Sequence, residues 1–198
     1  MRILHYSLGI YPHRTGGLNR YCTDLIREQS KTHKVALLYP SGYSIWQRKC
    51  HVSKPNKRDG IIYYRLINAE PVPLLYGIKN PKDFYGKKAD IKNIEFFYNN
   101  FHPDVLHLHT MMGLPEEVLK FFKDKEVRIV YTSHDYFGIC PKVNFMNAKG
   151  NLCDGSGSQK CMCCNKKAPT TLFLKIRNSE IALAIRDFFK WIKSIIHY

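Results

Sequence analysis

The chain has 198 residues, and its hydrophobic content of 44% is enough to build a core and excludes wholesale disorder. It contains no run of eighteen apolar residues and its start is too polar for a signal peptide, so we expect no transmembrane helix and a cytoplasmic location. The net charge of +15 favours anionic partners, namely phosphate-bearing substrates or an anionic lipid surface. Nucleic acid is disfavoured, because no nucleic-acid-binding motif accompanies the charge.

Hydrophobic periodicity predicts alternating strands and helices up to residue 132. Strands are predicted at residues 3–7, 34–39, 61–66, 103–109 and 127–132, and helices at residues 18–30, 88–101 and 115–125. Residues 43–60 predict a polar loop or hairpin, and the prolines and glycines of residues 68–86 predict a long surface loop. The helix at residues 88–101 is expected to turn inward Ile91, Ile94, Phe97, Tyr98 and Phe101. This alternation predicts an α/β fold with a doubly wound, mainly parallel sheet, in which ligands bind beyond the carboxyl ends of the strands.

The chain changes character after residue 139. Residues 144–153 predict a hairpin, a Gly/Ser segment follows, and residues 171–196 predict one long helix that is amphipathic and basic. That helix either packs on the domain's own sheet or binds a membrane surface or a partner. The chain is therefore divided into a domain at residues 1–139, a cysteine-rich insertion at residues 140–170 and a C-terminal helix at residues 171–198.

A glycine pair follows the first predicted strand. Gly16 and Gly17 stand directly before the first predicted helix, and His13 and Arg14 lie in the same loop. Backbone N–H groups at a helix start carry partial positive charge, and glycine lets a phosphate approach the backbone closely. Because the dinucleotide-binding and P-loop fingerprints are both absent, the loop predicts either an anion site or a tight structural turn.

Three histidines stand at or near the ends of predicted strands. His107 and His109 alternate with leucines, so both point to one face of their strand, and His109 lies nearer the strand end. His134 comes directly after the next strand and is followed by Asp135. A neutral imidazole can exchange hydrogen bonds with a sugar hydroxyl or a phosphate, whereas the alternative is a histidine that caps a strand end.

Five of the seven cysteines lie within residues 140–164. Cys161 and Cys164 have the spacing of a zinc knuckle, and Cys140 and Cys153 could complete a tetrahedral set of thiolates. Such a zinc site would be structural, because four thiolates leave no open position. The alternative is a set of reduced cysteines that pair on oxidation.

Three blocks of the chain resemble family 4 retaining glycosyltransferases. They are residues 1–21, which hold the glycine pair, residues 103–109, and residues 132–141, whose sequence TSHDYFGICP is similar to the family's T-x-H-D-x-x-x-x-C-P stretch. The order and spacing of the blocks agree over nearly the whole chain, so the resemblance rests on three motifs in register.

The family has the GT-B fold, in which two Rossmann-like domains face each other across a cleft, and the resemblance implies that this chain is the N-terminal, acceptor-side domain. It implies that Gly16 and Gly17 approach the diphosphate of a nucleotide-sugar donor and that His134 is the catalytic histidine beside the reacting sugar. The residues that it places along the acceptor side of the cleft are His13, Arg14, His109 and Asp135. It implies no catalytic divalent metal, because backbone amides and basic side chains stabilise the leaving diphosphate.

The resemblance also implies a setting. The acceptor is expected to be a glycan or a lipid-linked molecule of cell-envelope polysaccharide or glycolipid synthesis. The basic surface, densest at residues 79–88, would suit a peripheral protein on the anionic inner face of the plasma membrane.

The family's second, donor-binding domain and its pair of glutamates have no counterpart within the 198 residues. We therefore expect a truncated chain, a fragment, or one half of a split enzyme whose donor half is a separate chain, and no sugar transfer by this chain alone. Two other hypotheses are a non-catalytic binding or interaction module and a zinc-stabilised nucleic-acid binder.

Overall fold

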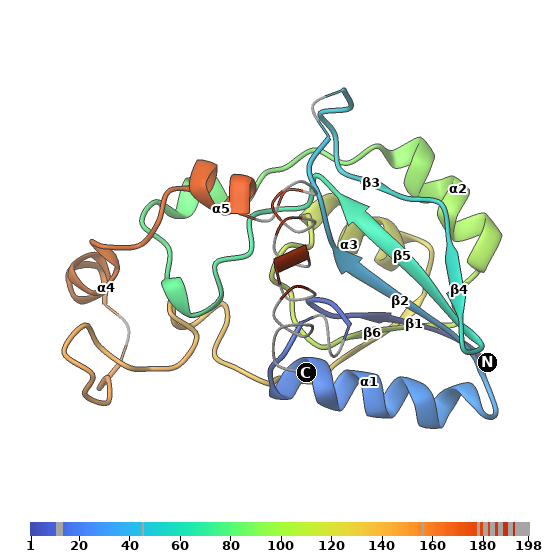
Figure 1. Cartoon of the computed structure of the whole chain (residues 1–198), viewed down its shortest axis with the longest axis horizontal. Coiled ribbons are helices and arrows are strands. Elements are labelled where there is room, and N and C mark those ends of the chain that lie inside the picture. The colour runs from blue at the N-terminus through green and yellow to red at the C-terminus, as the bar shows by residue number, and fades with distance from the viewer. Residues whose placement is uncertain are drawn as a thin grey trace.

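The computed structural model describes residues 1–10, 14–44, 46–155 and 157–177, together with residues 179, 182, 185, 188, 189 and 192. These residues form a seven-stranded sheet with helices on both faces, and an extension at one side that contains the cysteine-rich segment (Figure 1). No helix in this part of the chain is long and apolar enough to cross a membrane.

Five parallel strands form the centre of the sheet. They are β1 (Arg2–Tyr6), β2 (Lys34–Pro40), β5 (Ile61–Ile67), β6 (Val105–Leu108) and β7 (Arg128–Tyr131). Their order across the sheet is β5-β2-β1-β6-β7. Counted along the chain this is the order 3-2-1-4-5 of a doubly wound Rossmann-like sheet, which confirms the predicted fold class. Two short strands, β3 (His51–Val52) and β4 (Asn56–Arg58), pair antiparallel with β5, so the predicted excursion folds back on the sheet edge.

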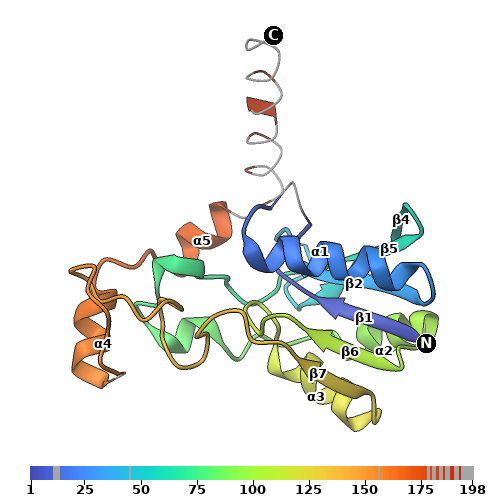
Figure 2. The same ribbon diagram turned by 90° about the horizontal axis from the view of Figure 1, so that it is seen from below.

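Alternate strand residues face two different helical layers, because side chains of a strand point to opposite faces in turn. The helices are α1 (Gly17–Ser30), α2 (Ile91–Phe101) and α3 (Glu116–Asp124). Leu4 and Leu38 belong to the larger core, to which α2 and α3 contribute. Val35 and Leu37 belong to a smaller core closed by α1. Figure 2 shows α1 on one side of the sheet and α2 and α3 on the other.

The helix α2 begins three residues later than predicted. Ala89 is held in a β-bridge with Cys50, and Asp90 caps the helix by accepting a hydrogen bond from Asn93 N at 3.3 Å. Ile91 was expected to point inward but is 43% exposed, since the face of the helix that packs on the core starts at Ile94.

The loop after β5 is buried in its first half, so the prediction of a surface loop is wrong there. Residues 68–73 are buried, because polar side chains satisfy neighbouring backbone groups: Asn68 Oδ1 accepts from Ser44 N at 2.8 Å. The half that follows contains two short 3₁₀ helices, η1 (Leu74–Tyr76) and η2 (Pro81–Phe84), and carries most of the loop's exposed side chains.

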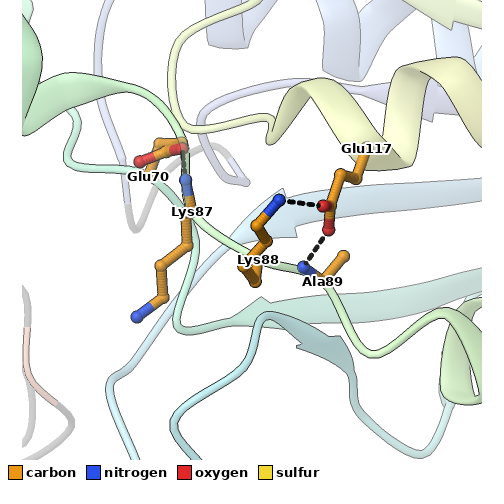
Figure 3. A network of polar contacts seen from close by, with 5 residues as sticks. All are labelled: Glu70, Lys87, Lys88, Ala89 and Glu117. Atoms are coloured by element: carbon orange, nitrogen blue, oxygen red, sulfur yellow. Dashed lines mark hydrogen bonds and ion pairs between the residues drawn. The ribbon is translucent and has the colours of Figure 1, made fainter.

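Two glutamates hold the segment that leads into α2 (Figure 3). Glu117 of α3 accepts hydrogen bonds from Lys88 Nζ at 2.8 Å and from Ala89 N at 2.7 Å, and Glu70 accepts one from Lys87 N. Lys88 is therefore engaged in an ion pair, and the basic stretch at residues 79–88 is not uniformly free.

The predicted hairpin in the cysteine-rich segment is present. Met146 and Leu152 form an antiparallel bridge, and Cys153 N donates to the carbonyl of Phe145 at 2.7 Å. A short helix that the sequence pattern did not predict follows, α4 (Ser158–Asn165).

A hydrogen bond and a cation–ring contact are among the contacts that join this extension to the loop after β5. Asn165 Oδ1 accepts a hydrogen bond from Ile78 N at 2.9 Å, and the guanidinium of Arg177 lies 4.5 Å from the centre of the Tyr76 ring. Arg177 belongs to α5 (Thr171–Arg177), the start of the predicted C-terminal helix. The remainder of that prediction falls mainly on positions outside the described residues.

Candidate functional site

The candidate site lies at the carboxyl ends of β1, β6 and β7. The strand order reverses between β1 and β6, and doubly wound sheets bind their ligands at such a switch point. His5 of β1 pairs in register with His107 of β6, so the two histidines lie on the neighbouring strands between which the order reverses. The predicted location of the site therefore coincides with a polar layer on the α1 side of the sheet.

The glycine loop ends at the start of α1. Gly16 is the N-cap and has φ of +125°, a conformation that favours glycine. A Cβ on Gly16 or Gly17 would meet no atom within 4 Å, so the backbone there is open. The first turn of α1 has no acidic residue and no side-chain cap, which leaves its partial positive charge uncompensated.

A chain of hydrogen bonds runs from α1 to the end of β7. Gln29 Oε1 lies 2.8 Å from His5 Nε2, and His5 Nδ1 lies 3.0 Å from His109 Nε2. The chain continues from His109 Nδ1 to His134 Nε2 over 3.3 Å. We call this set the histidine relay: Gln29, His5, His109 and His134. Its two inner histidines are fully buried, whereas His134 is half-buried at its end.

The relay has a direction. Gln29 Oε1 can only accept, so the proton of neutral His5 is on Nε2 and its Nδ1 accepts from His109 Nε2. The Nδ1 atom of His109 then accepts from His134 Nε2. This leaves His134 Nδ1 with a free lone pair, which can accept a hydrogen bond from a ligand.

The environment keeps these imidazoles neutral. Burial lowers the pKa of His5 to about 4 and, with neighbouring histidines adding to the effect, the pKa of His109 to about 2. The pKa values of His107 and His134 are lowered as well, mainly by burial, and Asp135 partly opposes the change at His134. A neutral chain of imidazoles is therefore expected at pH 7.

Tyr21 connects the relay to the glycine loop. It lies one helical turn after Gly17, and its ring meets His134 edge-on with 4.9 Å between centroids and His109 with 5.9 Å. His107 stacks on His109 at 4.3 Å, which confirms that the two point to one face.

The side chains of two further predicted site residues make hydrogen bonds to the backbone of their own loops. Asp135 Oδ1 accepts from Phe137 N at 2.9 Å, which fixes the turn after His134. Arg14 donates from Nη1 to the carbonyl of Leu8 at 2.9 Å. His13 lies outside the described residues.

Comparison with known proteins identifies the family. Residues 15–151, more than half of the chain, match the model of Glycosyltransferase Family 4. The chain belongs to glycosyltransferase family 4. The resemblance found in the sequence is thereby confirmed, and the match includes Gly16, Gly17, His109 and His134 but ends before Cys153.

One solved structure similar to this chain is the catalytic domain of starch synthase IV from Arabidopsis thaliana bound to ADP and acarbose. The identity is 19% and the TM-score 0.36, and the match covers 68% of this chain and 34% of that one, so this family 4 chain spans about a third of the length of that protein. No curated protein matches.

Two relay histidines, together with His107, form the group in the described part of this family 4 domain whose ligand atoms could hold a metal ion. Potential ligand atoms of His5, His107 and His109 lie within 4.8 Å of one another. These atoms already hydrogen-bond to one another or to Gln29, His134 and Thr132, so we interpret the group as a relay. The four predicted cysteine ligands do not form such a compact group within the described ranges; they line a cavity instead, far along the chain from the relay.

Three residues of the relay layer were missed in the sequence: His5, Tyr21 and Gln29. The signal for His5 was a histidine inside an otherwise apolar strand. Tyr21 has the spacing of an apolar packing position in α1, so the pattern did not mark it as a site residue, although it is 47% exposed. Gln29 carried no signal, because its role depends on how α1 lies across β1.

Proposed function

We propose that this domain forms one wall of a sugar-transfer site in which His134 contacts the transferred sugar and the glycine loop contacts the diphosphate of a nucleotide-sugar. The observation that carries the proposal is that the relay and the glycine loop meet: His134 contacts the ring of Tyr21, which lies one helical turn after Gly17 in α1. An open backbone with partial positive charge suits a diphosphate. A neutral imidazole with a free Nδ1 lone pair suits a sugar hydroxyl.

The burial of the relay has a chemical purpose in this proposal. A charged His134 would donate from both nitrogens and would attract phosphate instead of accepting from a hydroxyl. Gln29 and His5, acting through His109, hold His134 in the one tautomer whose free nitrogen is Nδ1. Gln29 and His5 are thus positioning residues, while His134 is the candidate for direct contact.

Binding to the 198-residue chain tests this proposal. Saturation-transfer NMR with UDP-glucose, UDP-N-acetylglucosamine and GDP-mannose should give sugar-proton signals with at least one probe. His134→Ala should lose these signals, and Gly17→Val should weaken the signals of the whole nucleotide-sugar by filling the open backbone. His33→Gln, at the opposite, amino edge of the sheet, is the matched control. Equal signals from His134→Ala and His33→Gln would contradict the proposal.

We propose further that this chain needs a second, donor-binding domain for turnover. One wall supplies only part of the contacts that stabilise the leaving diphosphate. Sugar transfer by the purified chain with no partner added would contradict this statement.

The proposed acceptor is a glycan or a lipid-linked molecule, and the proposed location is the anionic inner surface of the plasma membrane. A specific observation favours the surface: Leu75 and Tyr85 are 61% and 63% exposed on the loop after β5, and the same loop carries exposed Lys79 and Lys82. Apolar side chains with basic neighbours are typical of peripheral membrane contact.

Vesicle sedimentation tests the membrane contact. The double variant Lys79→Glu/Lys82→Glu should bind less to vesicles that contain phosphatidylglycerol, at low salt. Lys54→Glu/Lys57→Glu, in the excursion that pairs with the start of β5 and not with its end, changes the net charge equally and is the control. Equal loss by both variants would mean that net charge alone decides binding and would contradict a local contact.

A further inference from the structure

A cavity of about 480 Å³ in the cysteine-rich extension gathers most of the thiols of the chain. Its walls come from the turn at Cys140, the hairpin that ends at Cys153, and the helix α4, which carries Cys161, Cys163 and Cys164. Three segments that are separate in the sequence thus place five cysteines around one space, and all five are free thiols.

The other two cysteines show what a purely structural thiol looks like in this chain. Cys22 and Cys50 are buried in the apolar cores, and burial raises the pKa of each to about 12. Such thiols are protonated and inert. The cavity cysteines are half-buried or exposed, and a metal ion can reach them.

The extension has almost no core of its own. Among the described residues at 140–170, only Val143, Asn165 and Ala168 are buried. Small units that cannot bury enough apolar surface are usually held by disulfides or by a metal ion. This is an argument from stability for a cross-link in the place where the cysteines gather.

We propose that this cavity is a structural zinc site. Its four thiolate ligands are Cys140, Cys153, Cys161 and Cys164. Zinc prefers four thiolates in a tetrahedron, and a site closed in this way has no open position for catalysis. The proposal goes beyond the sugar-transfer site and does not depend on it.

The positions of the cysteines on α4 select the ligands. Cys161 and Cys164 are three residues apart and share one face of the helix, whereas Cys163 borders the cavity from a different side of the helix and is the exposed one of the three. The Cys164 thiol already reaches the hairpin, with its Sγ 3.8 Å from the Met146 carbonyl. Cys153 Sγ lies 3.0 Å from the carbonyl of Gly155, on the way into α4.

Charge in the cavity fits the same ion. Zinc with four thiolates is doubly negative, and Lys142, Lys149 and Lys160 line the cavity. Lys160 also pairs with Asp154 at 2.8 Å. Cationic side chains in the cavity wall offset part of the negative charge of such a centre.

The sulfurs lie around the cavity and are not gathered at a point, so binding requires that they turn inward and that the hairpin and α4 approach each other. Zinc binding should therefore tighten the whole extension. Resistance of residues 140–170 to proteolysis becomes a second readout, and it does not depend on enzyme activity.

Metal analysis of the full chain, purified under reducing conditions without chelator, tests the proposal. We expect one zinc per chain, and cobalt substitution should produce the thiolate charge-transfer and tetrahedral ligand-field bands of a sulfur site. Cys161→Ser and Cys153→Ser should each weaken zinc affinity by more than about 100-fold. Even the loss of a residue that only hydrogen-bonds to a metal ligand typically lowers metal affinity 10- to 100-fold. Cys163→Ser is the matched control and should bind normally.

Three results of the binding measurements would overturn the proposal. They are the absence of zinc uptake by the reduced wild-type chain, uptake that survives both ligand variants, and uptake that is lost in His5→Gln instead. If a ligand variant misfolds, proteolysis of the wild-type chain still tests the proposal. Added zinc should slow cleavage within residues 140–170, and a chelator should reverse this effect. Faster or unchanged cleavage with zinc, or protection only by oxidation to disulfides, would also overturn it.

Discussion

Acidification is the perturbation to which the buried relay should be most sensitive. The pKa values of His5 and His109 in the folded protein, about 4 and about 2, lie below the unfolded value of 6.5. Between pH 6.5 and pH 4 the unfolded chain therefore binds these protons while the folded chain does not. The stability present above pH 6.5 is lost as the pH falls, by about 1.4 kcal/mol per pH unit for each histidine. Because each unfolded histidine is only half protonated at pH 6.5, the two together should remove about 3 kcal/mol from pH 6.5 to 5.0, which is a large part of the 5 to 15 kcal/mol typical of a domain.

Urea unfolding under reducing conditions, followed by circular dichroism at half-unit steps from pH 6.5 to 5.0, measures this slope. His109→Asn should reduce the slope by about half, because one of the two neutral histidines is removed. A wild-type free energy of unfolding that stays constant over this range would refute the claim that both histidines are kept neutral by burial.

Three further variants and one control test which contacts support the fold around the site. Gly113→Ala should lower the free energy of unfolding in urea by about 2 to 4 kcal/mol, because Gly113 has φ of +82° and a Cβ would lie 2.9 Å from Val72 Cγ2. The control Gly60→Ala, at φ of +75° with open space around the Cβ, should lower it by only about 1 kcal/mol. Equal losses by the two variants would contradict the packing argument. Tyr6→Phe should lose about 1 to 2 kcal/mol by removing a buried donor to a backbone carbonyl 2.8 Å away, and no loss would contradict that role. Glu117→Gln should speed amide hydrogen exchange at the start of α2, and unchanged exchange there would mean that the clamp is not what orders this segment.

The strands and the mainly parallel, doubly wound sheet could be predicted because short apolar runs separated by helical patterns permit few topologies. The meeting of His109 and His134 was also predictable, since both follow neighbouring parallel strands and so reach the same edge of the sheet. The glycine loop was found because its residues stand directly before a helix start.

Other features depend on contacts that no local pattern reports. The hydrogen bond between Gln29 and His5 joins residues 24 positions apart and depends on how α1 packs across β1. Burial of residues 68–73 depends on side chains that bond to the backbone of distant loops. The helix α4 has no clear apolar face, and its contact through Asn165 with the loop after β5 helps to position it.

Nitrogen NMR of the histidine side chains tests the central claim most directly, that the relay presents His134 as a neutral acceptor to a nucleotide-sugar. In the ¹⁵N-histidine-labelled chain at pH 7, we predict that His5, His109 and His134 are neutral, each with its proton on Nε2. Adding a nucleotide-sugar probe should shift the Nδ1 resonance of His134 while His102, the C-terminal cap of α2, stays unchanged. A charged His134, or a proton on its Nδ1 with no response to any of the probes, would contradict the account.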